Sequence, residues 1–206
     1  MNEGGITDSF RTITKSSRIE IKVNKSAFIA NSFPVKNKEE AEMKTDEIRK
    51  EFFDARHHPY AYKFGITEDK IKFSDDGEPS GTSGKPILKA IEKFKITDAL
   101  IIVTRYFGGV KLGTGGLKRA YFEAAELCIS ESGITEKLIT KEVQIECDYK
   151  YINNVMRLIE KYELKIKDNK SADRIKLIID TRLSLIEPFK SDYTNITSGK
   201  GSIVTL

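Results

Sequence analysis

The residues best able to do chemistry lie in two short runs between residues 74 and 121. The first run, 75–86, is acidic and the second, 104–119, is basic, and both are rich in glycine. Eight of the fourteen glycines of the chain lie between Gly77 and Gly116. Glycine permits positive φ and lets the backbone approach a ligand closely, at an entropic cost. This clustering favours a functional site, with tight turns and close helix–strand packing as the structural alternative.

The basic run has the features of an anion site. It follows an apolar strand-like segment, 99–103, and leads into a helical pattern that begins near Thr114 or Gly115. Unpaired amides and the positive end of the helix dipole meet at such a helix start and attract anions. The glycine spacing matches neither the Walker pattern nor the dinucleotide pattern. The residues assigned to this predicted anion or nucleic-acid site are Arg105, Tyr106, Gly108, Gly109, Lys111, Gly113, Gly115, Gly116, Lys118 and Arg119.

The acidic run places Asp75, Asp76 and Glu78 within four residues. These carboxylates could hold magnesium together with phosphate and water. They could equally pair with Arg105 or Lys111, or cap backbone amides, and short Asp/Gly/Pro/Ser strings are also ordinary turns. Four cations around one turn repel one another unless an anion or the acidic loop balances them. We therefore predict that the two runs close on each other and form one polar cleft.

The remaining reactive side chains are few. His57 and His58 are adjacent and would point to different sides of an extended backbone, which argues against their binding one ligand together. We expect a histidine bonded to neighbouring backbone, with His57 as a further donor to the central site. The two cysteines, Cys128 and Cys147, form no metal or redox motif. No spaced ligand set for a two-metal site and no nucleophile elbow occur, which argues against a dipeptidase or a serine or cysteine hydrolase.

Composition excludes several classes of protein. The chain has 206 residues, enough for one large or two small domains, and 39% hydrophobic residues support a real core. The net charge is only +4, so nucleic-acid binding needs a local basic patch. The first ten residues show no secretory signal, and no apolar run reaches the ~20 residues that span a bilayer. We expect a cytoplasmic protein with reduced thiols and no membrane partner.

The first 136 residues show an α+β pattern. Residues 1–17 are polar and are expected to form a loose arm. Helices are predicted at 37–55, with Asn37 as the N-cap, at 86–94, with Ser83 or Gly84 near its start, and from Thr114 to about Gly133. The predicted strands are 18–23, 26–33, 60–66, 70–73 and 97–103, with a turn at 67–69 between the third and the fourth.

The remainder of the chain, from residue 137, has its own pattern. Strands are predicted at 143–147, 164–166, 174–180 and 202–206, and helices at 152–162 and 185–193. The order strand-helix-strand-strand-helix-strand is that of a ferredoxin-like fold. We therefore expect two domains, 1–136 and 137–206.

The two runs also carry a family resemblance. Residues 75–88, DDGEPSGTSGKPIL, and 103–121, VTRYFGGVKLGTGGLKRAY, resemble the paired loops of the YigZ/IMPACT family. Upstream, 55–62, ARHHPYAY, and 25–30, KSAFIA, are similar to two further family segments. The resemblance is strong over about residues 15–132. It implies an N-terminal ribosomal-protein-S-five domain-two-like domain and a C-terminal ferredoxin-like domain similar to the last domain of elongation factor G.

The resemblance implies a link to translational control under stress. The 206 residues hold no match to the kinase-regulator-like RWD domain of eukaryotic IMPACT proteins, so only a general translation or stress role carries over. One hypothesis is a non-enzymatic module that binds RNA or the ribosome, in which Tyr106 or Phe107 stacks on a base. The other is an enzyme that handles phosphate or a nucleotide, using the acidic loop and magnesium as cofactor; a dipeptidase label also occurs in the family. We rank the binding module first and expect no cofactor.

Overall fold

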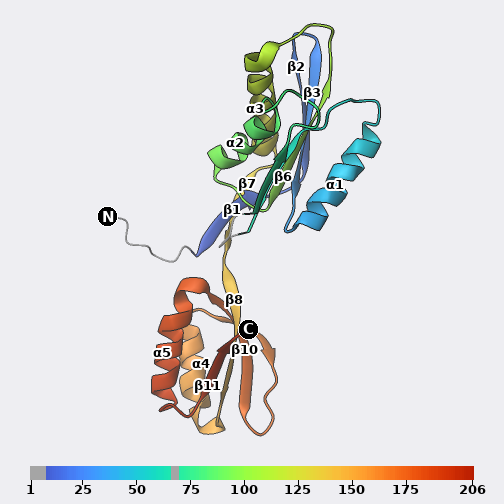
Figure 1. Cartoon of the computed structure of the whole chain (residues 1–206). Helices are drawn as coiled ribbons and strands as arrows, with labels where there is room; N and C mark the ends of the chain where they lie inside the picture. Colours follow the sequence, from blue (N-terminus) through green and yellow to red (C-terminus); the bar gives the residue numbers. More distant parts are fainter. Residues whose placement is uncertain (1–7, 66–69) are drawn as a thin grey trace, which may run out of the picture. The chain divides into compact units, whose positions relative to one another are not determined.

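The computed structural model describes residues 8–65 and 70–206 and divides into two compact units. One unit is Phe10–Lys137, and the other is Leu138–Leu206 together with the described residues that precede Phe10. Figure 1 shows that each unit has its own sheet and its own helices. The predicted turn at 67–69 lies outside the described residues. Among the described residues, none of the helices is long and apolar enough to cross a membrane.

The N-terminal unit is built on a five-stranded antiparallel sheet in the order β2-β3-β6-β4-β5. The strands are β2 (Ser17–Val23), β3 (Ser26–Pro34), β4 (Tyr60–Phe64), β5 (Lys70–Ser74) and β6 (Ala99–Tyr106). The central strand β6 is buried on both faces: Ile101 and Val103 join one hydrophobic cluster, and Leu100 and Ile102 join another. Its continuous apolar run therefore reflects a strand covered on both sides.

Helices cover both faces of this sheet (Figure 1). They are α1 (Lys38–Glu51) on one face, and α2 (Gly84–Phe94) and α3 (Gly113–Glu131) on the other. Asn37 is the N-cap of α1, because its side chain accepts a hydrogen bond of 2.8 Å from the amide of Glu40. The cap predicted from the sequence is thus confirmed. The larger core lies between the sheet and the pair α2 and α3, where Phe28 and Tyr121 meet edge to face.

The prediction of a loose arm over residues 1–17 is wrong for its second half. Strand β1 (Ser9–Ile13) pairs with β7 (Ile134–Leu138) in a small two-stranded sheet that the sequence analysis did not predict. Thr12 and Ile13 are about 1% exposed, and the carboxylate of Asp8 accepts a hydrogen bond of 2.6 Å from the amide of Ser184. The prediction failed because it used only the polar composition of this segment, whereas the segment pairs with strand β7, more than 120 residues away in the chain.

The C-terminal unit has a four-stranded antiparallel sheet in the order β11-β8-β10-β9. Its elements are β8 (Thr140–Cys147), α4 (Ile152–Lys161), β9 (Lys165–Asn169), β10 (Ile175–Arg182), α5 (Ile186–Ile196) and β11 (Ser202–Thr205), with short 3-10 turns at Tyr149–Tyr151 and Leu183–Leu185. The two helices lie together over one face of the sheet (Figure 1). This order of elements and strands is the ferredoxin-like plan. The α+β class expected for the chain is confirmed.

Candidate functional site

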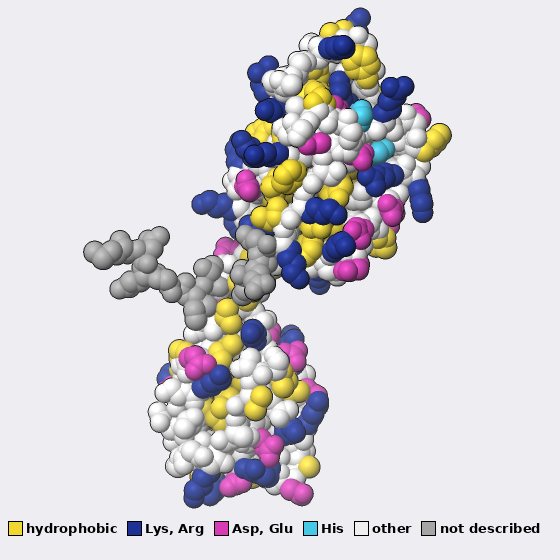
Figure 2. Space-filling model, viewed as in Figure 1, with side chains coloured by type: hydrophobic (Ala, Val, Ile, Leu, Met, Phe, Trp, Pro, Cys, Tyr) yellow, Lys and Arg dark blue, Asp and Glu magenta, His cyan; other side chains and the backbone are white. Residues whose placement is uncertain are grey.

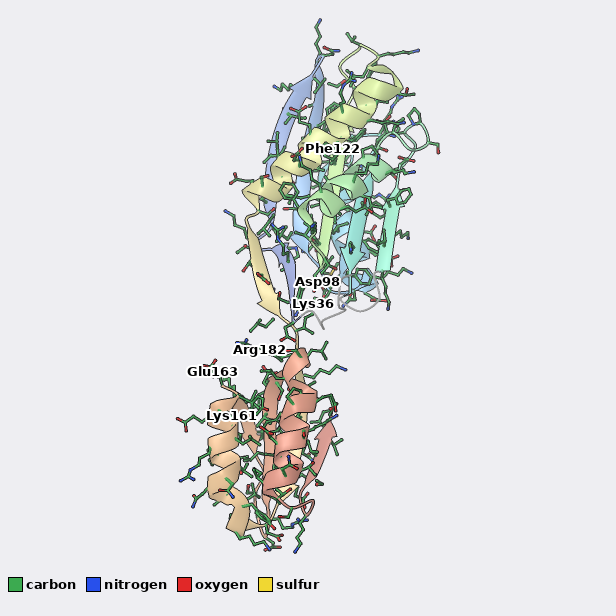
Figure 3. The ribbon with its side chains drawn as sticks, turned by 90° about the vertical axis from the view of Figure 1, so that its left-hand side faces the viewer. Lys36, Asp98, Phe122, Lys161, Glu163 and Arg182 are labelled. Carbon is green, nitrogen blue, oxygen red and sulfur yellow. The ribbon has the colours of Figure 1, made fainter. Side chains whose placement is uncertain are left out.

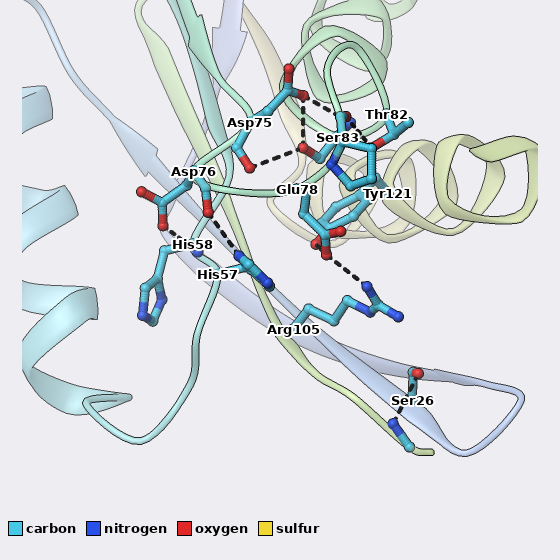
Figure 4. A network of polar contacts seen from close by, with 12 residues as sticks. Ser26, His57, His58, Asp75, Asp76, Glu78, Thr82, Ser83, Arg105 and Tyr121 are labelled. Carbon is cyan, nitrogen blue, oxygen red and sulfur yellow. Dashed lines mark hydrogen bonds and ion pairs between the residues drawn. The ribbon is translucent and has the colours of Figure 1, made fainter. Parts of the chain in front are cut away.

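The acidic and basic runs meet through a buried ion pair. Arg105, near the end of β6, donates from Nη1 to Oε1 of Glu78 at 2.8 Å, and the Tyr121 hydroxyl donates to the same oxygen at 2.7 Å. Figure 4 shows the Arg105 and Glu78 side chains pointing at each other. The Arg105 side chain is 9% exposed and that of Glu78 is 3% exposed. The two runs therefore close on each other as predicted, but Arg105 is bound to protein and is not a free surface cation.

Asp75 holds the start of α2. Its Oδ1 accepts hydrogen bonds from the amides of Ser83 at 3.0 Å and Gly84 at 2.9 Å, and its Oδ2 accepts one from Gly81 at 2.7 Å. Burial acts to raise the pKa of Asp75, but these donors together with the Ser83 hydroxyl hold it below its usual value. The Ser83 side chain makes no capping hydrogen bond to α2. The Asp75 carboxylate, which precedes the helix by several residues, accepts from the first amides in its place.

Asp76 joins the acidic loop to the histidine segment. Its carboxylate accepts from Arg49 at 2.8 Å and from the amide of His58 at 2.7 Å, and its carbonyl oxygen lies 2.8 Å from Nδ1 of His57. His58 is buried, its Nδ1 lies 3.0 Å from the Thr104 hydroxyl, and burial lowers its pKa. The imidazole rings of the two histidines thus contact different partners, in keeping with the expectation that they point to different sides (Figure 4).

These contacts leave the acidic loop poorly suited to magnesium. All three of its carboxylates already accept hydrogen bonds from protein donors. Residues 8–65 and 70–206 hold no group of three or more His, Cys, Asp or Glu side chains that could bind a metal ion. A magnesium site usually combines one or two carboxylates that are free to face phosphate and water. The donor set here fits a structural role.

A hollow of about 640 Å³ opens beside the ion pair. It is lined by Asp54, Ala55, Arg56, His57, Glu78, Pro79, Arg105, Tyr106, Phe107, Lys111, Leu112, Gly113, Thr114 and Leu117. We call it the ion-pair pocket. It brings together predicted site residues from both runs and His57, and it adds Arg56, Asp54 and Thr114, which the sequence analysis did not assign. Arg56 stands next to His57 in the chain, and that adjacency was the available signal.

Aromatic side chains form part of the wall of the ion-pair pocket. The guanidinium carbon of Arg105 lies 5.5 Å from the ring centres of both Phe28 and Phe107, so the charge sits between two rings. Phe107 is 60% exposed. The Tyr106 hydroxyl donates to Asp54 at 2.6 Å, and this bond raises the pKa of Tyr106 to about 12. Tyr106 is therefore a neutral donor at physiological pH, held to the end of the segment that follows α1.

The start of α3 faces the same pocket without a cap. Leu112, at the N-cap position, offers no side-chain hydrogen bond, and the first turn carries no acidic residue. The first amides of a helix have no partner inside the helix, and the dipole makes this end positive. Gly113 and Thr114 belong to this turn and line the pocket. The uncapped helix start predicted after the glycine run is therefore present in the fold, while anion binding there stays a prediction.

Gly108 has a different role from the one predicted. A Cβ built on Gly108 would lie 2.0 Å from the carbonyl carbon of Lys25, and its amide donates to the Ser26 hydroxyl at 3.1 Å. The basic loop thus packs backbone against backbone on the turn between β2 and β3. Only glycine fits such an approach. Gly108 fixes the loop in place and does not line the ion-pair pocket.

Lys118 and Arg119 lie in a separate hollow between α2 and α3. This hollow has a volume of about 330 Å³ and is lined by Gly81, Lys85, Pro86, Lys89, Lys118, Arg119 and Phe122. We call it the basic groove. Figure 3 shows Phe122 on α3, close to α2. Lys85 and Lys89 were not predicted as site residues, although their spacing of four residues puts them on one face of α2.

The described residues do not neutralise the cations of the basic groove. Within residues 8–65 and 70–206, no carboxylate forms an ion pair with Lys85, Lys89, Lys118 or Arg119. On the face seen in Figure 2, by contrast, basic and acidic side chains are mixed over both units. Most other lysines of α1 and α2 have partners, as Lys93 has in Glu126 and Lys44 in Glu47. The predicted basic site is therefore divided between the ion-pair pocket and the basic groove.

Comparison with known proteins shows which family the chain belongs to. The family described as the Impact N-terminal domain matches residues 24–129, which include both runs, the ion-pair pocket and the basic groove. The chain belongs to the IMPACT family. It is 30% identical over 195 residues to the IMPACT family member YvyE of Bacillus subtilis, covering 95% of this chain and 90% of that protein.

Other relatives match most of the length of this chain. It is 36% identical to an IMPACT family member of Haemophilus influenzae, over 88% of this chain and 89% of the relative. It is 28% identical to YigZ of Escherichia coli, over 89% and 91%. A solved structure described as that of a hypothetical protein covers 98% of both chains with a TM-score of 0.69 and 26% identity. Human protein IMPACT matches only 48% of this chain.

Proposed function

We propose that this IMPACT-family chain is a non-enzymatic protein that binds RNA or the ribosome and acts in translation or in a stress response. The observation that carries the proposal is the basic groove. Its four cations come from two adjacent helices and have no carboxylate partner among the described residues. The role in translation or stress rests on the family resemblance.

The charge of the basic groove favours a polyanion over a single small anion. Like charges held on neighbouring helix faces repel one another, and a phosphate backbone removes this repulsion while releasing its counterions. The net charge of the whole chain is only +4, so the local cluster, and not the bulk charge, would direct binding. Phe122 in the groove and Phe107 at the ion-pair pocket add rings on which bases could stack.

A magnesium-dependent phosphate enzyme has less support. Asp75 caps α2, Asp76 binds Arg49 and the His58 amide, and Glu78 binds Arg105 and Tyr121. Freeing any of these carboxylates for a metal would leave its protein donors unpaired. The cost of such unpaired buried groups is about 1–3 kcal/mol each. This structural use of the acidic loop accounts for its sequence without catalysis.

The proposal is tested with purified ribosomes and single-stranded RNA. The variant Lys89→Ala/Lys118→Ala removes one cation from each helix of the groove. The control, Lys22→Ala/Lys44→Ala, removes the same charge from lysines outside the groove that have ion-pair partners. We expect the groove variant to bind more weakly by about tenfold or more at moderate salt, while the control stays near the parent. Equal binding by both variants, or no binding by the parent at low salt, would contradict the proposal.

A further inference from the structure

The geometry points to a second binding site, distinct from the basic groove: we propose that the ion-pair pocket binds one nucleoside monophosphate unit. The ligand's phosphate would lie at the start of α3, and its base would stack on Phe107. The inference does not rest on the proposed role in RNA binding, because the pocket and the groove share no lining residue.

The phosphate end is supported by the groups around the start of α3. Gly113 and Thr114 line the pocket from a helix turn that has no side-chain cap and no acidic residue. Lys111 and Arg56 also line it, both are exposed, and neither has an ion-pair partner among the residues that the structure describes. A phosphate satisfies helix amides and fixed cations together.

Arg105 supplies an independent sign of a missing partner. Its side chain is 9% exposed, and its Nε atom has no hydrogen-bond partner among the described residues although it is fully buried. Buried donors are nearly always satisfied, and an exception calls for a water, an ion or a ligand. The Glu78 contact uses only Nη1. Nη2 also has no hydrogen-bond partner among the described residues, so Arg105 retains a donor at the wall of the pocket.

The base end is supported by Phe107 and by the shape of the pocket. The Phe107 ring lies over the Arg105 guanidinium, while the residue is 60% exposed, so ring surface remains for a flat partner. Pro79, Leu112 and Leu117 give the pocket apolar lining. A volume of about 640 Å³ falls in the range typical of small-molecule pockets, about 300–1,000 Å³. Inorganic phosphate alone would leave most of this apolar and aromatic lining unused.

The same chemistry could come from a free nucleotide or from the phosphorylated end of an RNA. Both present one phosphate group and one base. Adenosine 5′-monophosphate serves as the free probe, and a four-nucleotide RNA with a 5′-phosphate serves as the other. The same RNA with a 5′-hydroxyl separates recognition of the terminal phosphate from general binding of the chain.

The test follows the backbone amide signals of Gly113 and Thr114 by nuclear magnetic resonance during titration of the whole chain. We expect adenosine 5′-monophosphate to shift both signals and to bind more tightly than either inorganic phosphate or adenosine. Phe107→Ala should weaken binding about 5–150-fold through lost stacking. Lys111→Ala should weaken it about tenfold, as expected for a charge-assisted hydrogen bond. Lys22→Ala is the control and should leave the affinity unchanged.

The titrations have outcomes that support the proposed site and outcomes that contradict it. Saturable shifts with the free nucleotide, or with the 5′-phosphorylated RNA and not its 5′-hydroxyl form, support the site and identify its source. Inorganic phosphate binding as tightly as the nucleotide, or Phe107→Ala binding as tightly as the parent, would overturn it. Phe107 and Lys111 are exposed, so neither substitution threatens the fold. Loss of RNA binding through the basic groove would leave these titrations unchanged.

Discussion

Arg105 and Glu78, 27 residues apart in the chain, form an ion pair of 2.8 Å between two side chains that are both more than nine-tenths buried. The contact joins the acidic loop to the end of β6, and Tyr121 adds a hydrogen bond from α3. Three segments of the N-terminal unit are thereby held around one carboxylate. Glu78 and Arg105 both line the ion-pair pocket, so this contact forms part of its wall.

Removing Glu78 should destabilise the protein strongly. Glu78→Leu leaves the Arg105 charge buried without a partner, and we expect a loss of about 3–5 kcal/mol in the free energy of unfolding, measured with urea. The double variant Glu78→Leu/Arg105→Met should recover much of that loss, because no charge is then left buried. The exposed pair Arg18 and Glu51 provides the control: Glu51→Leu should cost under about 1 kcal/mol. Similar losses for Glu78→Leu and Glu51→Leu would contradict this account.

Asp75 should make stability depend on pH in the acid range. Its pKa in the folded state is lowered, so its contribution is present above the unfolded value of about 3.9 and is lost as the pH falls through the lower folded value. Asp75→Ala should cost about 2 kcal/mol at pH 7, because the amides of Gly81, Ser83 and Gly84 lose their acceptor.

The same variant should differ less from the parent at low pH. Denaturant unfolding at pH 7 and near pH 2.5 gives the two differences directly. We expect the gap between the parent and Asp75→Ala to narrow at the lower pH, since protonation removes the charge that the amides stabilise. A gap that is constant with pH would show that the carboxylate charge contributes nothing to the cap.

Two glycines in the basic run should respond oppositely to alanine. At Gly108 a Cβ would meet the Lys25 backbone at 2.0 Å, so Gly108→Ala should displace the loop and destabilise the protein by more than about 2 kcal/mol. At Gly115 the nearest atom to such a Cβ is the Arg119 side chain at 3.9 Å, and the backbone is helical. Gly115→Ala should therefore stabilise by about 0.5–1 kcal/mol. Thermal unfolding of both variants tests these two predictions, and equal changes in stability at the two positions would contradict them.

Most of the fold could be predicted from local sequence pattern. The alternation in β2, the apolar run in β6 and the Asn37 cap are properties of a few adjacent residues, and the ferredoxin-like order follows from the order of such segments. Strand β1 was not predictable in this way. Three of its five residues are polar, and its partner β7 follows α3 far along the chain.

The location of the candidate site could be predicted from the sequence, but its division into the ion-pair pocket and the basic groove could not. Arg105 looks like a phosphate ligand in sequence, yet the position of Glu78 on a distant loop turns it into a buried ion pair. Lys118 and Arg119 follow the glycine turn closely, but the helical rotation carries them to the groove beside α2. The local sequences of α2 and α3 do not show that these two helices pack against each other. Lys85 and Lys89 therefore became part of a site only in the folded chain.

The salt dependence of RNA binding is the sharpest test of whether the basic groove binds a phosphate backbone. Each phosphate contact that the basic groove makes contributes about 0.7 to the slope of log affinity against log salt for a single strand. If the groove binds the backbone, Lys89→Ala/Lys118→Ala should reduce that slope by about 1.4, while Lys22→Ala/Lys44→Ala should leave it unchanged. A slope that is the same in all three proteins, or RNA binding that is insensitive to salt, would contradict the assignment of the basic groove to RNA.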